Sequence, residues 1–390
     1  MSQPHVAIVG AGIVGLAHAW SAAKRGHAVT VFERSRIASG ASIRNFGMVW
    51  PIGQPAGERH QTALRSRSAW MELAREADVW VNRCGSIHLA HRDDEWAVLE
   101  EFAAAAASLG YDCQLLDAAA VLQRTPAANP DRLIGGLYSD AELCVNPRLA
   151  IAGIPRWLSE RFGVKFEFNT TIVGAESGLL RASDGRSWSA DWTVICGGAD
   201  IETLFPERLA TCGLKLCKLQ MLRTVSQPAG WRIGPHLASG LTLRHYQNFS
   251  ICKSLPELRQ RIADETPELD QFGIHVMASQ NDQGEVVLGD SHEYDDEISP
   301  FDKSLIEELM LRELLQVIRL PDWTIRERWN GCYLKHPVEC NLLESPLPRV
   351  FLCTATGGAG MTMSFGLAER IWDEWDRTAE LKPNFQEVMR

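Results

Sequence analysis

The chain has 390 residues, 45% of them hydrophobic, and a formal net charge of −10 at pH 7. This length is sufficient for two domains with a large buried core. The acidic balance and the absence of basic runs argue against a nucleic-acid binder and against a basic membrane-surface patch. The longest alanine run, residues 103–107, is far too short to span a bilayer, so no membrane span is expected.

The ten cysteines are scattered along the chain, without a C-x-x-C pair, and no secretory segment precedes the first apolar run. This pattern predicts reduced thiols in a cytoplasmic protein. The histidines and cysteines show no metal-ligand spacing, so the sequence predicts no metal site.

The chain opens on a strand, a glycine turn and a helix. Residues 6–9 are apolar and predict a buried parallel strand, and residues 17–23 predict a helix that stops at Gly26. Gly10, Gly12 and Gly15 lie between them at G-x-G-x-x-G spacing. At this spacing the first glycine permits the tight turn, the second admits a pyrophosphate to the backbone, and the third allows close helix–strand packing. We therefore expect a dinucleotide on the amides of the helix N-terminus, which includes Ile13 and Val14.

Glu33 supports this interpretation. It ends a second predicted strand, residues 28–32, about 20 residues after the glycines, where a carboxylate accepts hydrogen bonds from the ribose hydroxyls. A 2′-phosphate would face this carboxylate, so Glu33 argues against NADP.

Further elements follow in chain order. Up to residue 196 we expect a helix at 58–78, a strand at 84–91, helices at 94–109 and 118–123, a strand at 135–138, a helix at 146–161, strands at 164–168 and 171–176, a hairpin of 179–182 and 187–190, and a strand at 192–196. Beyond it we expect strands at 218–224, 241–246, 249–253 and 286–289, a helix at 303–317, a strand at 350–356 and a helix at about 364–375.

A second glycine turn, Gly-Gly-Ala-Gly at 357–360, follows the predicted strand 350–356. It brings another helix N-terminus to the carboxyl edge of the sheet, where doubly wound folds bind ligands. A reduced flavin carries negative charge near N1 and the C2 carbonyl, and a positive helix end suits that charge. The alternative is a glycine-rich connection without a ligand. Together with the first turn, this second turn favours FAD.

Several motifs spread over the whole chain resemble the FAD-dependent D-amino-acid oxidase superfamily, whose members include glycine oxidase and sarcosine oxidase. They are the opening glycine motif with Glu33-Arg34, the segment 40–48, Cys196-Gly197-Gly198-Ala199, Trp329-x-Gly331 and residues 357–362. The resemblance implies that FAD contacts come from Arg34, Ser42, Arg44, Asn45, Gly47, Met48, Ile172, Val173, Gly197, Gly198, Gly331, Gly358, Ala359, Gly360, Met361 and Thr362. Some relatives attach flavin to a cysteine near the position of Cys332, but the surrounding residues do not match, so non-covalent FAD is expected.

Narrower motifs, at 44–48, 243–246, 289–294 and 358–366, resemble a bacterial subgroup associated with aminophosphonate breakdown. That resemblance implies oxidation of 2-aminoethylphosphonate or its N-methyl derivative, with hydride transfer to flavin N5 and hydrolysis of the imine to an aldehyde. Glycine oxidase holds its substrate carboxylate with an arginine close to the position of Tyr333, and this chain has none there. The alternative substrate is glycine, sarcosine or a D-amino acid. A flavin monooxygenase and a non-catalytic flavoprotein are further alternatives.

An anionic substrate needs cationic or hydrogen-bonding partners. The candidates for catalysis and substrate binding are His245, Tyr246, His292, Lys335 and His336. On the expected strand 241–246, alternation turns His245 away from the face that Arg244 occupies. Each candidate also has a structural interpretation, as a core histidine, a half-buried tyrosine or a solvated turn. The resemblance puts Val287 where one relative uses a lysine to activate oxygen, which leaves O2 or another electron acceptor open.

These observations predict an α/β fold with an FAD-binding, Rossmann-like doubly wound parallel sheet and a mostly antiparallel β-sheet substrate domain with helices. The FAD-binding domain is expected to be discontinuous, at residues 1–82, 145–212 and 328–390. The substrate-binding domain is expected at 83–144 and 213–327.

Overall fold

The fold is that of a computed structural model, which describes residues 3–295 and 298–380. Its first sheet has the strand order β20-β21-β13-β1-β2-β9, with all neighbours parallel except β20, which runs antiparallel at one edge. The bounds are β1 His5–Val9, β2 Ala28–Phe32, β9 Lys165–Glu167, β13 Trp192–Ile195, β20 Leu342–Leu347 and β21 Val350–Thr354. Strands from the start, the middle and the end of the chain therefore share one sheet, as the sequence predicts.

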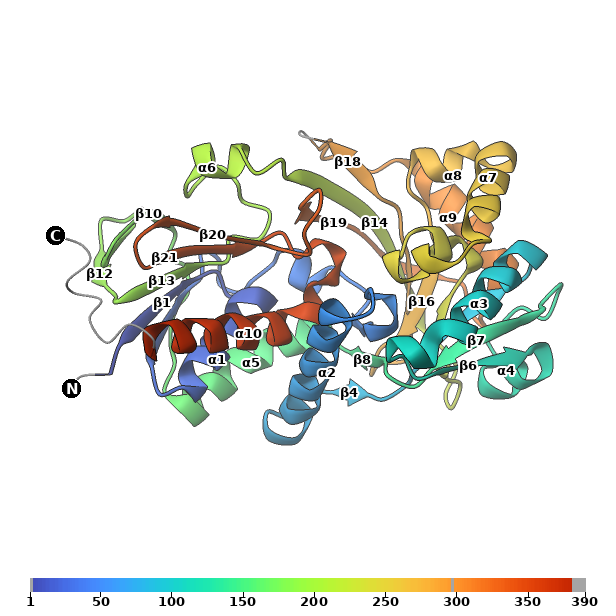
Figure 1. Cartoon of the computed structure of the whole chain (residues 1–390), viewed down its shortest axis with the longest axis horizontal. Helices are drawn as coiled ribbons and strands as arrows, with labels where there is room; N and C mark the ends of the chain where they lie inside the picture. The colour runs from blue at the N-terminus through green and yellow to red at the C-terminus, as the bar shows by residue number, and fades with distance from the viewer. Residues whose placement is uncertain (1–2, 296–297, 381–390) are drawn as a thin grey trace.

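The parallel sheet is covered on both faces (Figure 1). Val6 and Ile8 of β1 pack with one core that contains helices α1 (Ile13–Lys24), α5 (Pro147–Phe162) and α10 (Gly360–Glu380). Ala7 faces the other way and packs with a small antiparallel sheet, whose strands are β10 Ile172–Glu176, β11 Leu179–Ala182 and β12 Ser187–Ser189. Helix α2 (Glu58–Glu76) lies against α10. Burial on both faces explains why β1 and β2 are continuous apolar runs.

The second large sheet has nine strands in the order β18-β14-β17-β16-β15-β5-β7-β6, with β19 also paired to β14. Every pair is antiparallel except β15 with β5. The bounds are β5 Ser86–Ala90, β6 Cys113–Asp117, β7 Gly135–Ser139, β14 Lys215–Ser226, β15 His236–Ala238, β16 Met277–Gln280, β17 Glu285–Gly289, β18 Glu293–Asp295 and β19 Ile325–Lys335. The predicted fold class is thereby confirmed.

Helices cover the outer face of this sheet, at the opposite end of the molecule from β1 and β12 (Figure 1). They are α3 Asp93–Ala106, α4 Ala118–Arg124, α7 Leu255–Glu265, α8 Pro267–Gln271 and α9 Ser304–Val317, while α6 Pro206–Ala210 lies apart from them. A three-stranded sheet of β3 Met48–Val49, β8 Leu143–Val145 and β4 Val81–Asn82 connects the two halves. Within the described ranges, no helix is long and apolar enough to cross a membrane.

Two predicted strands are wrong. Residues 241–246 and 249–253 instead contain the 3-10 helices η4 Gly240–Arg244 and η5 Gln247–Ile251. The alternating leucines at 241 and 243 imitate a strand, but Thr242 between them is also buried and bonds back to Ser239. Without a partner strand, the segment satisfies its backbone locally. The face-alternation argument for His245 therefore fails, although Arg244 does turn away, to Asp270.

Candidate active site

Both glycine turns open on one cavity of about 500 Å³ at the carboxyl ends of the parallel strands. Its lining includes most of the residues that the sequence predicts for the cofactor: Gly10, Gly12, Ile13, Val14, Glu33, Arg34, Ser42, Arg44, Asn45, Met48, Ile172, Gly197, Gly198, Gly331, Gly358, Ala359, Gly360, Met361 and Thr362. The predicted site residues His245, Tyr246, His292, Lys335 and His336 line the same cavity. Segments that are up to about 350 residues apart thus converge, as a doubly wound sheet requires.

The glycines of the first turn differ in what they do. Gly10 adopts a φ of +103°, which a residue with a side chain rarely takes. A Cβ on Gly15 would lie 1.9 Å from the carbonyl oxygen of Gly10, so helix α1 can only approach β1 this closely with glycine there. Gly15 does not line the cavity and acts through packing alone. The turn therefore leaves bare backbone at the cavity wall.

Glu33 is held by the backbone. Its Oε2 accepts from the Ala11 amide at 3.0 Å, and its Oε1 accepts from the Ser35 amide at 3.0 Å. Each carboxylate oxygen keeps a further lone pair for a ligand hydroxyl. The side chain is thus fixed at the cavity wall, where its free lone pairs can accept from a ligand.

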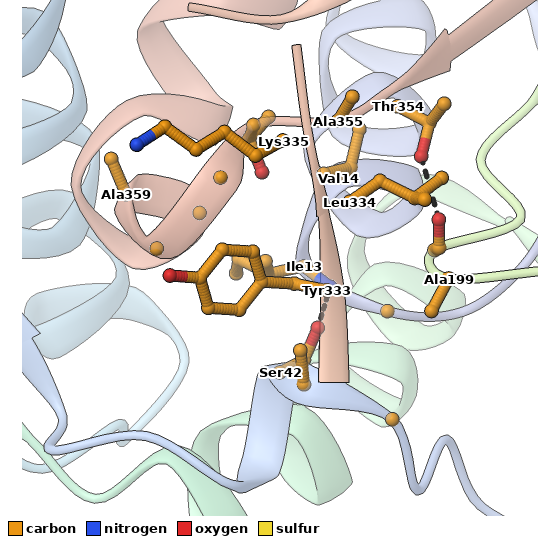
Figure 2. Close-up of a pocket in the computed structure, with 18 of the residues that line it drawn as sticks. Ile13, Val14, Ser42, Ala199, Tyr333, Leu334, Lys335, Thr354, Ala355 and Ala359 are labelled. Atoms are coloured by element: carbon orange, nitrogen blue, oxygen red, sulfur yellow. Dashed lines mark hydrogen bonds between the residues drawn. The ribbon is translucent and has the colours of Figure 1, made fainter. Parts of the chain in front are cut away.

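The segment 40–48 is braced by its own side chains. Ser42 Oγ accepts from the Ile13 amide at 2.9 Å, which ties this loop to the N-terminus of α1 (Figure 2). Asn45 donates to the carbonyl oxygens of Ala41 and Ser42 and accepts from the Gly47 amide. Gly47 has a φ of +74° and faces Val145 rather than the cavity. Its contribution is to the turn.

The second turn carries the start of α10. The helix begins at Gly360, four residues earlier than the sequence predicts, directly after the short 3-10 helix η6 Gly357–Ala359. Thr354 donates to the carbonyl oxygen of Gly198 at 2.8 Å and so joins this turn to the middle glycine segment (Figure 2). Helix N-terminal amides of α1 and α10 therefore point at one cavity.

These residues fit FAD. The first turn offers bare backbone for a pyrophosphate, Glu33 faces the ribose position, and a second helix N-terminus lies where a flavin ring needs positive potential. Three predicted cofactor residues fall outside the cavity lining: Gly15, Gly47 and Val173. Val173 is 47% exposed, and the wall there is formed by Thr170, Thr171 and Ile172.

At the other end of the cavity, three imidazoles lie together. The ring centroids of His245 and His275 are 3.9 Å apart, and His292 lies 4.6 Å and 4.8 Å from them. The Asp290 carboxylate is 3.5 Å from His275 Nε2 and 3.7 Å from His292 Nε2. We refer to His245, His275 and His292 as the histidine cluster.

Burial keeps the histidine cluster uncharged. It lowers the pKa of His245 and His275 well below the ordinary histidine value, and neighbouring cationic groups lower them further. Burial also lowers the pKa of His292 to about 4 and raises the pKa of Asp290 well above its usual range. His245 is nevertheless exposed, because it lines both this cavity and a second, neighbouring pocket. Burial therefore favours the neutral forms of His275 and His292, which offer nitrogen lone pairs.

Aromatic side chains connect the histidine cluster to the second glycine turn. The Trp50 amide donates to Thr362 Oγ1 at 2.9 Å, and the Trp50 ring stacks on Tyr246, which contacts His245 and His275. Tyr333 lies 6.5 Å from His292, ring to ring. These rings provide the apolar wall of the cavity.

Tyr333 and Lys335 project from β19 on one side of the strand, and Leu334 points the other way (Figure 2). Lys335 Nζ lies 3.4 Å from the Tyr294 hydroxyl. Burial raises the pKa of Tyr333, so its hydroxyl stays protonated. His336 Nδ1 accepts from the Val338 and Glu339 amides, which gives it a structural role in the turn.

Four further residues line the cavity without being predicted from the sequence: His275, Asp290, Trp50 and Tyr333. Asp290 and Tyr333 are within or beside segments that were singled out, so their motifs carried a signal. His275 carried none: it is a single histidine between α8 and β16 and reaches the site only through the fold. Cys332 lines the cavity, and burial raises the pKa of its thiol.

A dinucleotide turn, a second helix N-terminus and an antiparallel sheet closing the cavity define a flavoprotein of the doubly wound type. Residues 5–373 match the model of the FAD dependent oxidoreductase (DAO) family, and the chain belongs to that family. FAD is its cofactor.

The chain is similar in sequence to two curated proteins and in fold to a solved structure. An opine oxidase subunit from Rhizobium meliloti is 24% identical over 350 residues, which cover 86% of this chain and 83% of that protein. Glycine oxidase of Geobacillus kaustophilus is 27% identical over 204 residues, 50% of this chain and 54% of that protein. The glycine oxidase structure from Bacillus cereus covers 96% of both chains with a TM-score of 0.76 at 16% identity, which shows the fold.

Proposed function

We propose that this enzyme uses FAD to oxidise a small amine that carries an anionic group, of the amino-acid type represented by glycine, sarcosine or a D-amino acid. The observation that carries the proposal is the single cavity, which joins both glycine turns to a polar end with one lysine, Lys335, in its wall. The names of its relatives, an opine oxidase and a glycine oxidase, support an amine with a carboxylate.

Bound FAD supplies the two-electron oxidation of the carbon–nitrogen bond. The chain's own residues orient the substrate and exclude water. Lys335 provides a positive charge for the anionic group, and the protonated Tyr333 hydroxyl donates a hydrogen bond beside it. Trp50 and Tyr246 form an apolar wall that limits water at the reacting carbon. Water then hydrolyses the product imine to a carbonyl compound and an amine.

Anaerobic reduction of the holoenzyme tests this function. Glycine, sarcosine, D-alanine and 2-aminoethylphosphonate are added in turn, and loss of flavin absorbance and the carbonyl product are measured. We expect at least one of these to bleach the flavin at least tenfold faster than ethylamine, which lacks the anionic group. Equal rates with ethylamine, or no bleaching by any of the four, would refute the proposal.

The second candidate substrate is 2-aminoethylphosphonate or its N-methyl derivative. Position 333 is a tyrosine, and the arginines among the described lining residues are engaged elsewhere: Arg34 with Asp200, Arg44 with Asn330 and Arg59 with Gln247. A carboxylate clamp of the glycine oxidase kind is therefore missing from β19, which leaves room for another anion. Comparing kcat/KM for 2-aminoethylphosphonate and for β-alanine, its carboxylate analogue, separates the two candidates.

The expected division into an FAD-binding part, 1–82, 145–212 and 328–390, and a substrate-binding part, 83–144 and 213–327, remains our proposal. The electron acceptor, O2 or another oxidant, is part of the same proposal. Hydrogen peroxide measured alongside the carbonyl product decides it, because O2 as acceptor gives one peroxide for each carbonyl formed.

A further inference from the structure

We propose that the histidine cluster, His245, His275 and His292, together with Asp290, binds one divalent transition-metal ion of the Zn²⁺ type. The site lies at the end of the cavity away from the first glycine turn. It contradicts the expectation from sequence that the chain holds no metal.

The spacing of the three rings suits one ion. One ligand nitrogen from each histidine can be chosen so that all three lie within 4.8 Å of one another. A point between atoms at that spacing is about 2.8 Å from each, and a zinc–imidazole bond is about 2.1 Å long. Each ring thus has to close by less than about 1 Å, which side-chain rotation achieves without moving the backbone.

Buried polar atoms without partners point to a missing ligand. His275 is 3% exposed and Asp290 is 5% exposed. Three of their atoms have no hydrogen-bond partner within residues 3–295 and 298–380. They are the two ring nitrogens of His275 and Oδ1 of Asp290. A buried polar group without a partner costs about 1–3 kcal/mol, and native proteins contain few of them. One bound cation would satisfy both side chains at once.

His292 is already oriented as a metal ligand. Its Nδ1 donates to the Gly273 carbonyl oxygen at 3.2 Å, which leaves the lone pair on Nε2. Histidines that ligate metals are held in this way by a backbone carbonyl or a carboxylate on the other ring nitrogen. His245 and His275 also line the neighbouring pocket, which gives an ion a second route to the cluster.

The donor atoms at this position suit a cation. The Asp290 carboxyl lies 3.5 Å from His275 Nε2 and 3.7 Å from His292 Nε2, so an oxygen ligand stands beside the ring nitrogens. Three nitrogens and one carboxylate are ligands that Zn²⁺ accepts readily.

The ion would also add a positive charge to that of Lys335 in the cavity wall. With the three histidines and Asp290 as ligands, a further group would enter as a fifth ligand, a coordination number that catalytic zinc sites can reach. This second step rests on the proposed function: the fifth ligand would be the anionic group of the amine, which Lys335 also attracts.

Metal binding to the tag-free holoenzyme tests the site. The protein is treated with a chelator, dialysed, and titrated with Zn²⁺ by calorimetry, and its metal content is measured by mass spectrometry. We expect about one Zn²⁺ per chain, and at least a 100-fold weaker affinity in His275→Ala. His336→Ala is the matched control, since His336 lines the same cavity outside the cluster, and its zinc content is expected to equal that of the wild type.

Folding and function are checked separately. If His275→Ala loses its FAD absorbance or its cooperative melting, His292→Gln replaces it, with the same expected loss of zinc. A wild-type protein that binds no Zn²⁺, or cluster variants that bind it like the wild type, would overturn the site. Zinc binding is measured without any amine, so a stoichiometric zinc site in a protein that oxidises no amine would refute only the proposed function.

Discussion

The two ends of the cavity are built differently. At the flavin end, the polar groups that face the ligand are already fixed by the protein: Glu33 by two amides, Ser42 by the Ile13 amide, and Asn45 by three backbone groups. At the histidine end, the described neighbours leave both nitrogens of His275 and one oxygen of Asp290 without hydrogen bonds. The polar groups of the first end are thus held by the protein alone, whereas the second end keeps buried polar atoms that a ligand can satisfy.

The difference also concerns charge. The flavin end attracts negative charge through helix N-termini. Their positive potential comes from backbone amides, which do not titrate. The histidine end has ionisable groups that burial holds neutral. We therefore expect substitutions at the flavin end to weaken cofactor binding, and substitutions at the other end to alter substrate use while FAD stays bound.

The largest effect is expected from Gly15→Ala. The added Cβ would lie 1.9 Å from the Gly10 carbonyl oxygen and would push α1 away from β1. We expect FAD affinity to fall at least about 100-fold, because the backbone cradle for the pyrophosphate is distorted. Fluorescence titration of the apoprotein with FAD measures it.

The matched control is Gly153→Ala, within α5, where the added Cβ meets no atom within 4 Å in the described structure. Alanine favours a helix interior by up to about 1 kcal/mol, so this variant should melt no lower than the wild type and bind FAD normally. A Gly15→Ala protein that purifies with one FAD per chain would contradict the rigid-cradle explanation.

The second-largest effect is expected from Lys335→Met, at the histidine end of the cavity. The substitution keeps the length of the side chain and removes its charge from the cavity wall. We expect KM for the anionic amine to rise by about 10- to 100-fold, the equivalent of one charge-assisted hydrogen bond, with an unchanged flavin spectrum. Steady-state kinetics with the substrate found in the anaerobic screen measures it.

Lys165→Met, on β9 and outside the cavity lining, is the control for nonspecific loss of charge. A Lys335→Met enzyme with the KM of the wild type would place the anionic group elsewhere. A loss of FAD from the Lys335→Met enzyme would show that the flavin end and the histidine end of the cavity are not independent.

Glu33→Gln should give a smaller change at the flavin end. The amide can still accept one backbone hydrogen bond, but the negative charge that strengthens the bonds to Ala11 and to the ribose is lost. We expect FAD affinity to fall about tenfold, with Glu176→Gln on β10, an exposed position, as the control. An unchanged affinity would mean that Glu33 serves only to hold the Ala11 amide.

The flavin end could be predicted from the sequence because its parts are local. A glycine spacing, an apolar strand and an acid at the next strand end are close in the chain, and each has one physical meaning. The parallel sheet followed from the same kind of pattern at residues 192–196 and 350–356. Even the start of α10 was misplaced by only one turn of helix.

The histidine end could not be predicted in the same way. His245, His275 and His292 come from three connections that only the nine-stranded sheet brings together. The segment before His245 was assigned to a strand because its leucines alternate, while the real constraint is a 3-10 turn packed on all sides. Tertiary contacts override local pattern where no repeat or motif fixes the geometry.

The smallest effect concerns a buried carboxyl that, unlike Asp290, has its own partners. Glu142 is fully buried, and it accepts from the Ile52 amide at 2.9 Å and from Ser86 at 3.0 Å, so it joins the short 3-10 helix Pro51–Gly53 to β5 of the second sheet. Burial raises its pKa above the ordinary value. The unfolded chain therefore ionises first, and this group contributes a loss of stability as pH rises from the ordinary glutamate pKa toward the raised one.

Glu142→Gln removes that dependence. Below the ordinary glutamate pKa both proteins are uncharged at this position and should melt alike, whereas at pH 7 the variant should melt about 1–3 °C higher. Glu100→Gln, at an exposed position of α3, should show no such trend. Melting curves from pH 4 to pH 8, with and without Zn²⁺, measure both. Because the hydrogen bonds of Glu142 come from the protein itself, zinc should leave its titration unchanged. A zinc-dependent shift in the pH dependence of melting would mean that the two ends of the cavity are coupled through this residue.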